Sequence, residues 1–228
     1  MIAAAPPPGS EAELEARAAD LAGITLAELA QHVGRPLPRD TRRGKGFAGQ
    51  LLEAALGASA GSLSEPDFQR IGVELKTVPV GANGRPLEST YVCTVPLELD
   101  HAPRWRDSAV RRKLARVLWL PVEGARELTL AQRRIGSAIL WTPDPIEEAS
   151  LRADWEELME LVMLGQVARI TAHQGSCLQV RPKAADASAR RWGVDERGVR
   201  VRTLPRGFYL RPGFTAAILA RRYAGIAG

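Results

Sequence analysis

The sequence SEPDFQRIGVELKTVPV, residues 64 to 80, carries the clearest structural signal in the chain. From residue 71 onward, its side chains alternate with a period of two, which predicts a half-buried strand. The alternation places Glu74 and Lys76 on one face of that strand, about 7 Å apart along the backbone. Asp67 lies a few residues upstream, after a short turn or helix, so its side chain can reach the same face.

Asp67, Glu74 and Lys76 together suit phosphodiester hydrolysis. The two carboxylates can hold a hard divalent cation such as Mg²⁺, which polarises a phosphoryl group and lowers the pKa of the attacking water. Lys76 can then orient that water or offset the developing charge. Two simpler interpretations stay open. Ser64 and Asp67 have the spacing of a capping box at a helix start, and Glu74 and Lys76 also fit a charge pair on a solvated sheet face.

Length and composition bound the class of protein. With 228 residues and 45% hydrophobic content, the chain can bury a core as one large domain or two lobes. We expect a flexible proline-rich tail at residues 1–9 and a single domain at 10–228. No signal peptide or long apolar run is found, which predicts a cytoplasmic protein without a membrane partner.

Several chemistries lack their motifs in this sequence. The two cysteines are far apart and the three histidines are scattered without metal-ligand spacing, which fits a reducing cytosol and argues against sulfur ligands. The phosphate-binding loop, the dinucleotide glycine motif and the nucleophile elbow are absent. Nucleotide binding and serine hydrolysis therefore have no support, whereas nuclease chemistry does.

Basic residues are unevenly distributed and mostly arginine. Residues 181 to 228 contain eleven Lys or Arg and three acids, an excess of eight positive charges against five for the whole chain. This concentration favours a polyanionic partner, most often nucleic acid, although a solvated Arg-rich surface is the simpler alternative. The 31 basic residues include only four lysines, and we interpret each as a candidate functional position: Lys45, Lys76, Lys113 and Lys183.

The remaining patterns predict an α/β fold with a mixed sheet. Amphipathic helices are expected between residues 10 and 33, from 45 to 57 and from 146 to 164. We expect strands 71–80 and 90–97 to form a hairpin, with a strand at 116–122 beside them. The C-terminal part is expected to contain strands at 177–181 and 199–204 and a closing helix.

Four further residues could extend a nuclease site. Glu53 lies off the apolar stripe of its helix, as an ordinary solvent-facing residue or a third carboxylate leaning toward the metal. Arg181, Lys183 and Tyr209 combine donors with an aromatic ring, which suits contacts with base edges and stacking. Tyr209 is equally compatible with a half-buried core position.

The chain resembles the MutH family of strand-nicking endonucleases in methyl-directed mismatch repair. The resemblance runs from about residue 10 to the C-terminus. It is carried by Gly44–Glu53 (GKGFAGQLLE), Leu56–Gly61, Asp67, Gly72–Pro79 (GVELKTVP), Arg116–Gly124, Arg181–Ala184 and Leu204–Leu210. One departure is Tyr91, where the family pattern leads us to expect Phe in a DNA-facing loop, so the fine contacts there are in doubt.

The resemblance implies a restriction endonuclease-like fold, with a mixed central sheet flanked by helices and two lobes around a DNA cleft. It implies Mg²⁺-dependent nicking of the unmethylated strand at hemimethylated GATC in double-stranded DNA. Activation would come from the MutL protein, with MutS acting through it, and the enzyme is expected to be a monomer. The reaction would use Asp67 and Glu74 as metal ligands, Lys76 as the catalytic lysine and Glu53 as an accessory carboxylate. The DNA contacts would come from Lys45 and Lys113 near the cleaved strand, and from Arg181, Lys183 and Tyr209 at the recognition site.

Two other functions remain open at this point. The protein could be a GATC-type restriction endonuclease that cuts both strands, in which case linear product would form without MutL. It could also be a non-catalytic DNA-binding module, whose binding would persist in EDTA. The intact carboxylates and Lys76 favour an enzyme.

Overall fold

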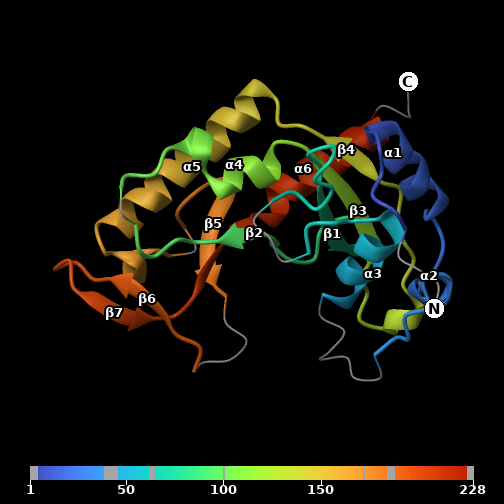
Figure 1. Cartoon of the computed structure of the whole chain (residues 1–228), viewed down its shortest axis with the longest axis horizontal. Coiled ribbons are helices and arrows are strands. Elements are labelled where there is room, and N and C mark those ends of the chain that lie inside the picture. Colours follow the sequence, from blue (N-terminus) through green and yellow to red (C-terminus); the bar gives the residue numbers. More distant parts are fainter. Residues whose placement is uncertain are drawn as a thin grey trace. The chain divides into compact units, whose positions relative to one another are not determined.

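The structure is a computed structural model that describes residues 5–38, 46–61, 65–99, 101–171, 173–183 and 188–224, without the side chains of 222–224. The chain divides into two compact units (Figure 1). The first comprises residues up to Glu88, Ala115–Thr142 and residues from Ala216 onward. The second comprises Ser89–Leu114 and Pro143–Thr215.

Three helices and a mixed sheet form the first unit. The helices are α1 (Glu11–Asp20), α2 (Leu26–Val33) and α3 (Phe47–Leu56). The strands are β1 (Glu74–Val80), β3 (Val117–Glu123) and β4 (Ile139–Trp141), in the order β1-β3-β4. β1 runs parallel to β3 and β4 antiparallel to it, so the sheet is mixed, as the sequence predicts.

The core of the first unit lies between the three helices and one face of this sheet. Leu14, Leu29 and Leu52, one from each helix, are buried in a single cluster with Leu75 and Leu118 of the strands (Figure 1). Because side chains alternate along a strand, Glu74 and Lys76 leave β1 on the opposite face. The apolar positions of residues 71 to 80 thus fix which face of β1 carries the charged pair.

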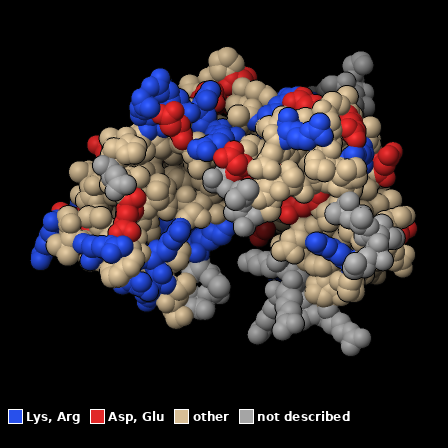
Figure 2. Space-filling view, in the orientation of Figure 1, with Lys and Arg blue, Asp and Glu red and all other residues tan. Residues whose placement is uncertain are grey.

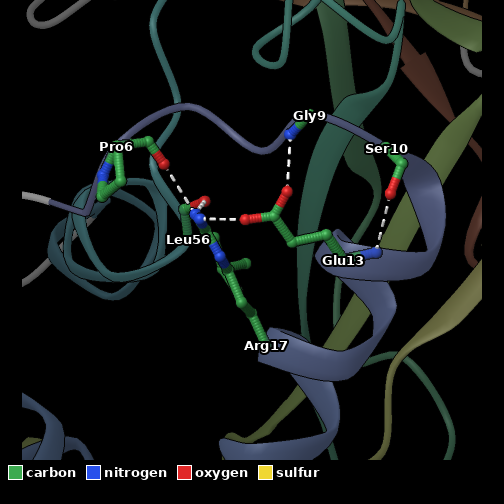
Figure 3. A network of polar contacts seen from close by, with 6 residues as sticks. All are labelled: Pro6, Gly9, Ser10, Glu13, Arg17 and Leu56. Atoms are coloured by element: carbon green, nitrogen blue, oxygen red, sulfur yellow. Dashed lines mark hydrogen bonds and ion pairs between the residues drawn. The ribbon is translucent and has the colours of Figure 1, made fainter.

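Ala5 and Pro6 contact the end of α3 and Arg17 of α1, and the flexible tail expected at residues 1–9 stays a prediction. Ala5 N donates to Ala54 O at 3.2 Å, and Arg17 Nη1 donates to Pro6 O at 2.6 Å and to Leu56 O at 3.1 Å (Figure 3). Ser10 caps α1 by accepting from Glu13 N at 3.2 Å. Arg17 thus satisfies the carbonyl oxygens of Pro6 and Leu56, whereas Ala54 O accepts from Ala5 N. Residues 1 to 4 lie outside the described part of the chain.

The second unit contains an antiparallel sheet, a hairpin and two α-helices. The sheet has the order β2-β8-β5, from β2 (Thr90–Thr94), β8 (Arg206–Leu210) and β5 (Leu178–Pro182). Strands β6 (Arg191–Val194) and β7 (Arg200–Thr203) form the hairpin. The helices are α4 (Ala109–Leu114) and α5 (Pro145–Met163), and α6 (Pro212–Ala224) begins in this unit and continues in the first. Short 3-10 turns cover Trp105–Asp107, Leu130–Gln132 and Val167–Arg169.

The predicted hairpin between residues 71–80 and 90–97 is wrong. β1 pairs with β3, whereas β2 pairs with β8 in a different sheet. After β1 the chain turns at Gly81–Gly84 and returns only as far as a single bridge between Val80 and Pro86. The alternating patterns identified both strands correctly, but alternation does not specify the pairing partner. No described helix is long and apolar enough to cross a lipid bilayer.

Candidate active site

Asp67 lies at the outer edge of β1. Glu74 N donates to Arg116 O on the β3 side, so Leu75 N points to the other edge, where it donates to Asp67 Oδ2 at 2.9 Å. A tight turn makes this possible, because Phe68 and Val73 form a bridge and Gly72 takes a φ of +67°. The described residues 65 to 73 contain no helix, so Asp67 is not part of the capping box considered above. The carboxylate of Asp67 thus sits beside the backbone between Glu74 and Lys76.

Glu74 and Lys76 form a buried ion pair on one face of β1. Lys76 Nζ donates to Glu74 Oε1 at 2.6 Å, and the two residues are 7% and 3% exposed respectively. The cross-strand partner of Lys76 is Trp119 of β3, which is fully buried. These charges are therefore not on a solvated sheet face, which removes the second simpler interpretation. Burying two charges costs free energy even when they are paired, so a buried ion pair adds little net stability. Stability alone therefore does not explain why Glu74 and Lys76 lie in this position.

The donors at this edge are hard oxygen ligands. Asp67 and Glu74 bring two carboxylates to the backbone around Leu75, and no group of three or more His, Cys, Asp or Glu suited to a metal occurs among the described residues. A closed structural zinc site, which takes four protein ligands, does not match this set. Mg²⁺ does, because it is usually held by one or two carboxylates, with water and substrate oxygens filling the other positions.

Glu53 belongs to the first unit as well. It is on α3 and lines an open cavity of about 1100 Å³ together with Leu75, Thr77 and Pro79. Leu75 and Thr77 leave β1 on the face opposite to Glu74 and Lys76, so Glu53 approaches the strand from the helix side. The accessory role of Glu53 stays a prediction.

The described contacts do not test the two remaining lysines of the predicted nicking site. Lys45 lies outside the described residues. Lys113 is on α4, which belongs to the second unit. Their roles near the cleaved strand remain predictions.

The predicted recognition residues gather on the sheet of the second unit. The rings of Tyr91 and Tyr209, which are paired across β2 and β8, are 5.4 Å apart and meet edge to face. Lys183 Nζ lies 2.8 Å from the centroid of Tyr91, and Arg181 Cζ lies 5.9 Å from that of Tyr209. Tyr91 lies at least 90 positions before the other three residues in the sequence, and the sheet brings them together. We call Tyr91, Arg181, Lys183 and Tyr209 the recognition cluster.

Three residues that sequence reasoning missed support the recognition cluster. Ser89 Oγ accepts from Arg181 Nη1 at 3.0 Å and from Gln179 Nε2 at 2.8 Å, so it fixes both side chains. Gly207 leaves room for the tyrosines, since a Cβ there would lie 2.9 Å from the Tyr91 ring. No pattern marks Ser89 or Gln179 in the sequence. Gly207 belongs to the Leu204–Leu210 motif, but the sequence alone does not show why a glycine is needed there.

Other titratable groups near this sheet do not add a second chemistry. Burial raises the pKa of the Cys177 thiol, which keeps the thiol protonated and unreactive at neutral pH. Burial also lowers the pKa of Arg206, at the start of β8, although a guanidinium remains charged under any ordinary condition. Asp154 of α5 accepts from the backbone N–H groups of Ser176, Cys177 and Leu178, and so anchors the beginning of β5.

A mixed α/β fold with two carboxylates and a lysine at the start of an edge strand fits the class of DNA endonucleases. Comparison with known proteins identifies the family. Residues 56–154 match the model of the DNA mismatch repair enzyme MutH. The chain is 55% identical to the DNA mismatch repair protein MutH of Klebsiella pneumoniae subsp. pneumoniae over 96% of this chain and 95% of that protein. It is also 55% identical to the proteins of the same name from Serratia proteamaculans, over 96% of both chains, and from Escherichia coli K12, over 95% of both. The chain belongs to the MutH family.

Proposed function

We propose that this DNA mismatch repair endonuclease nicks the unmethylated strand at hemimethylated GATC sites, with Mg²⁺ as cofactor. The observation that carries the proposal is the hydrogen bond from Leu75 N to Asp67 Oδ2, because it sets the Asp67 carboxylate beside the buried Glu74–Lys76 pair. Family membership along nearly the whole chain supports the same reaction.

The three side chains would divide the work of hydrolysis. Asp67 and Glu74 would hold the Mg²⁺ ion, which would supply Lewis acidity toward the scissile phosphate and its attacking water. Lys76 keeps its ammonium group oriented through Glu74 Oε1 at 2.6 Å. From that position it would orient the attacking water or neutralise charge that develops on the phosphoryl oxygens. Glu53, Lys45 and Lys113 would contribute as an accessory carboxylate and as contacts to the cleaved strand.

Sequence and methylation would be read by the recognition cluster. An arginine can form two parallel hydrogen bonds with a guanine edge, which suits Arg181, and Lys183 can add a single strong donor. Tyr209 would lie close to the adenine whose methyl group is sensed, so an added methyl group would meet its ring. Ser89 holds Arg181 in one direction, which reduces the entropy lost when the base contact forms.

The proposed biological setting follows the family. The enzyme would act as a monomer in the cytoplasm, activated by MutL, with MutS acting through MutL. These points are independent of the chemistry of Asp67, Glu74 and Lys76.

A plasmid with one hemimethylated GATC site tests the proposal. Wild-type enzyme with Mg²⁺ and MutL is expected to give open circular DNA, cut 5′ to the G of the unmethylated strand. The Glu74→Gln and Lys76→Met variants are expected to leave it supercoiled, whereas Arg152→Gln, an exposed change on α5, serves as the control. Linear product without MutL would indicate a restriction enzyme instead. Binding without cleavage under every metal condition would indicate a DNA-binding module.

A further inference from the structure

The β6-β7 hairpin presents an aromatic ring between two guanidinium groups. Trp192 is paired with Arg202 across the hairpin, and Val194 with Arg200, so these side chains share one face. Arg200 Cζ lies 4.3 Å and Arg202 Cζ 4.9 Å from the centroid of the Trp192 ring. We call Trp192, Arg200 and Arg202 the hairpin face. The reaction and the recognition cluster described above use none of these three residues.

The hairpin face is exposed and strongly positive. Trp192 is 41% exposed, an unusual state for the largest apolar side chain, and both arginines are exposed as well. Figure 2 shows Lys and Arg side chains gathered over β6 and β7. Two of the nearby acids are already engaged, because Glu196 pairs with Arg169 and Asp195 accepts from the backbone in the hairpin turn. The surface therefore favours an anionic partner.

The opposite side of the hairpin anchors it to the rest of the second unit. Gly193 is buried, and a Cβ at this position would lie 3.2 Å from Leu97 Cβ. Glu98 accepts from Arg200 Nε at 2.5 Å and raises the pKa of Arg200, so this guanidinium is held in place on the indole. A fixed guanidinium loses little side-chain entropy when it binds an anion.

The chemistry of the hairpin face fits phosphate groups. Glu98 takes up Nε and Nη2 of Arg200, which leaves Nη1 of this residue for a phosphate oxygen. A guanidinium stacked on an aromatic ring can present its edge N–H groups to two phosphate oxygens, which suits Arg202. Arg200 and Arg202 are two positions apart on β7, which separates them by about 7 Å and allows contacts with different phosphates. The face also adjoins a cavity of about 420 Å³ lined by Arg190, Arg191 and residues 95 to 98.

We propose that the hairpin face binds the phosphate backbone of duplex DNA outside the GATC sequence, independently of base sequence. The choice of duplex DNA as ligand rests on the proposed function. Such a contact would hold the enzyme on DNA that flanks its site. The competing partner is an acidic protein segment. Duplex DNA fits better, because its phosphates form a regular array of charges that two arginines on one strand can contact, whereas an acidic segment has no such regular array.

Binding to duplexes of two lengths tests the proposal. Fluorescence anisotropy would measure the affinity of the full chain for a duplex of about 12 base pairs centred on GATC and for one of about 40, in Ca²⁺ without cleavage. The test variant is Arg200→Gln. The control is Arg152→Gln, because Arg152 also pairs with a glutamate, lies in the same unit and has the same 60% side-chain exposure.

For the single variant Arg200→Gln we expect about a threefold loss of affinity for the long duplex. For the double variant Arg200→Gln, Arg202→Gln we expect a loss of about tenfold. The slope of log affinity against log salt should fall by about 0.9 for each phosphate that the variant no longer neutralises. Affinity for the short duplex should stay unchanged. The control should bind both duplexes like the wild type, and thermal melting would confirm that every variant is folded.

Equal losses for Arg200→Gln and Arg152→Gln would overturn the proposal, because they would reflect net charge alone. Unchanged DNA affinity combined with lost activation by MutL would also overturn it, in favour of an acidic protein partner. Since binding is measured without cleavage, failure of the nicking reaction leaves this result untouched.

Discussion

Removing one member of the buried Glu74–Lys76 pair is expected to destabilise the protein far more than removing both. The pair is almost fully excluded from solvent, with side chains 3% and 9% exposed, and its atoms approach to 2.6 Å. In Lys76→Met the Glu74 carboxylate loses its counter-charge inside the protein, which costs about 3–5 kcal/mol at pH 7. Glu74→Gln leaves the ammonium group in the same position and should cost a similar amount.

The double variant Glu74→Gln, Lys76→Met removes the uncompensated charge. Its stability should lie within about 1 kcal/mol of the wild type or exceed it, because the pair no longer has to be desolvated. Urea denaturation followed by circular dichroism would measure all four proteins, and all three variants should fail to nick DNA. Single variants that lose under about 1 kcal/mol, or a double variant whose loss equals the sum of the singles, would refute this reasoning.

Three further changes test other parts of the structure. Arg116 donates two hydrogen bonds to the Glu11 carboxylate, at 2.9 and 2.5 Å, and thereby holds the pKa of this carboxyl below its usual value. The pair therefore stabilises the protein above about pH 4.3, the usual pKa of Glu, and this stabilisation is lost as the pH falls through the lower pKa of the folded state. Glu11→Gln should therefore cost under about 1 kcal/mol at pH 7 in urea titrations and nothing in acid, since the pair is partly exposed. Gly57→Ala should cost about 1–3 kcal/mol by thermal melting, because φ is +83° and the new Cβ would lie 2.3 Å from Pro6 O. Gly207→Ala should push the recognition tyrosines apart and reduce discrimination between GATC and altered sites by about tenfold, measured as the ratio of nicking rates.

The sequence predicted the central strand well because its signal is local. Alternation alone placed Leu75 in the core and Glu74 with Lys76 on the other face, and the structure confirms both. The strand expected at residues 116–122 is also confirmed as β3, beside β1. These outcomes depend only on the period of the strand and on the burial of apolar side chains.

Features that depend on long-range pairing could not be predicted in the same way. The hairpin error arose because β1 and β2 both alternate, and nothing in either strand identifies β3 or β8 as its partner. Strand β6 was missed because Arg191–Val194 has only four residues, and the first two of them are exposed. Ser89 acts only through Gln179 and Arg181, 90 and 92 positions later, so its role is visible only in the folded chain.

A change of metal preference at Asp67 would show whether this carboxylate binds the catalytic cation, beyond its hydrogen bond to Leu75 N. In Asp67→Cys a thiolate replaces a hard oxygen ligand, and thiolates favour softer cations over Mg²⁺. The account predicts that the nicking rate of Asp67→Cys falls at least about a hundredfold in Mg²⁺ and recovers in part when Mn²⁺ or Cd²⁺ is supplied. A variant that nicks in Mg²⁺ at the wild-type rate would contradict it.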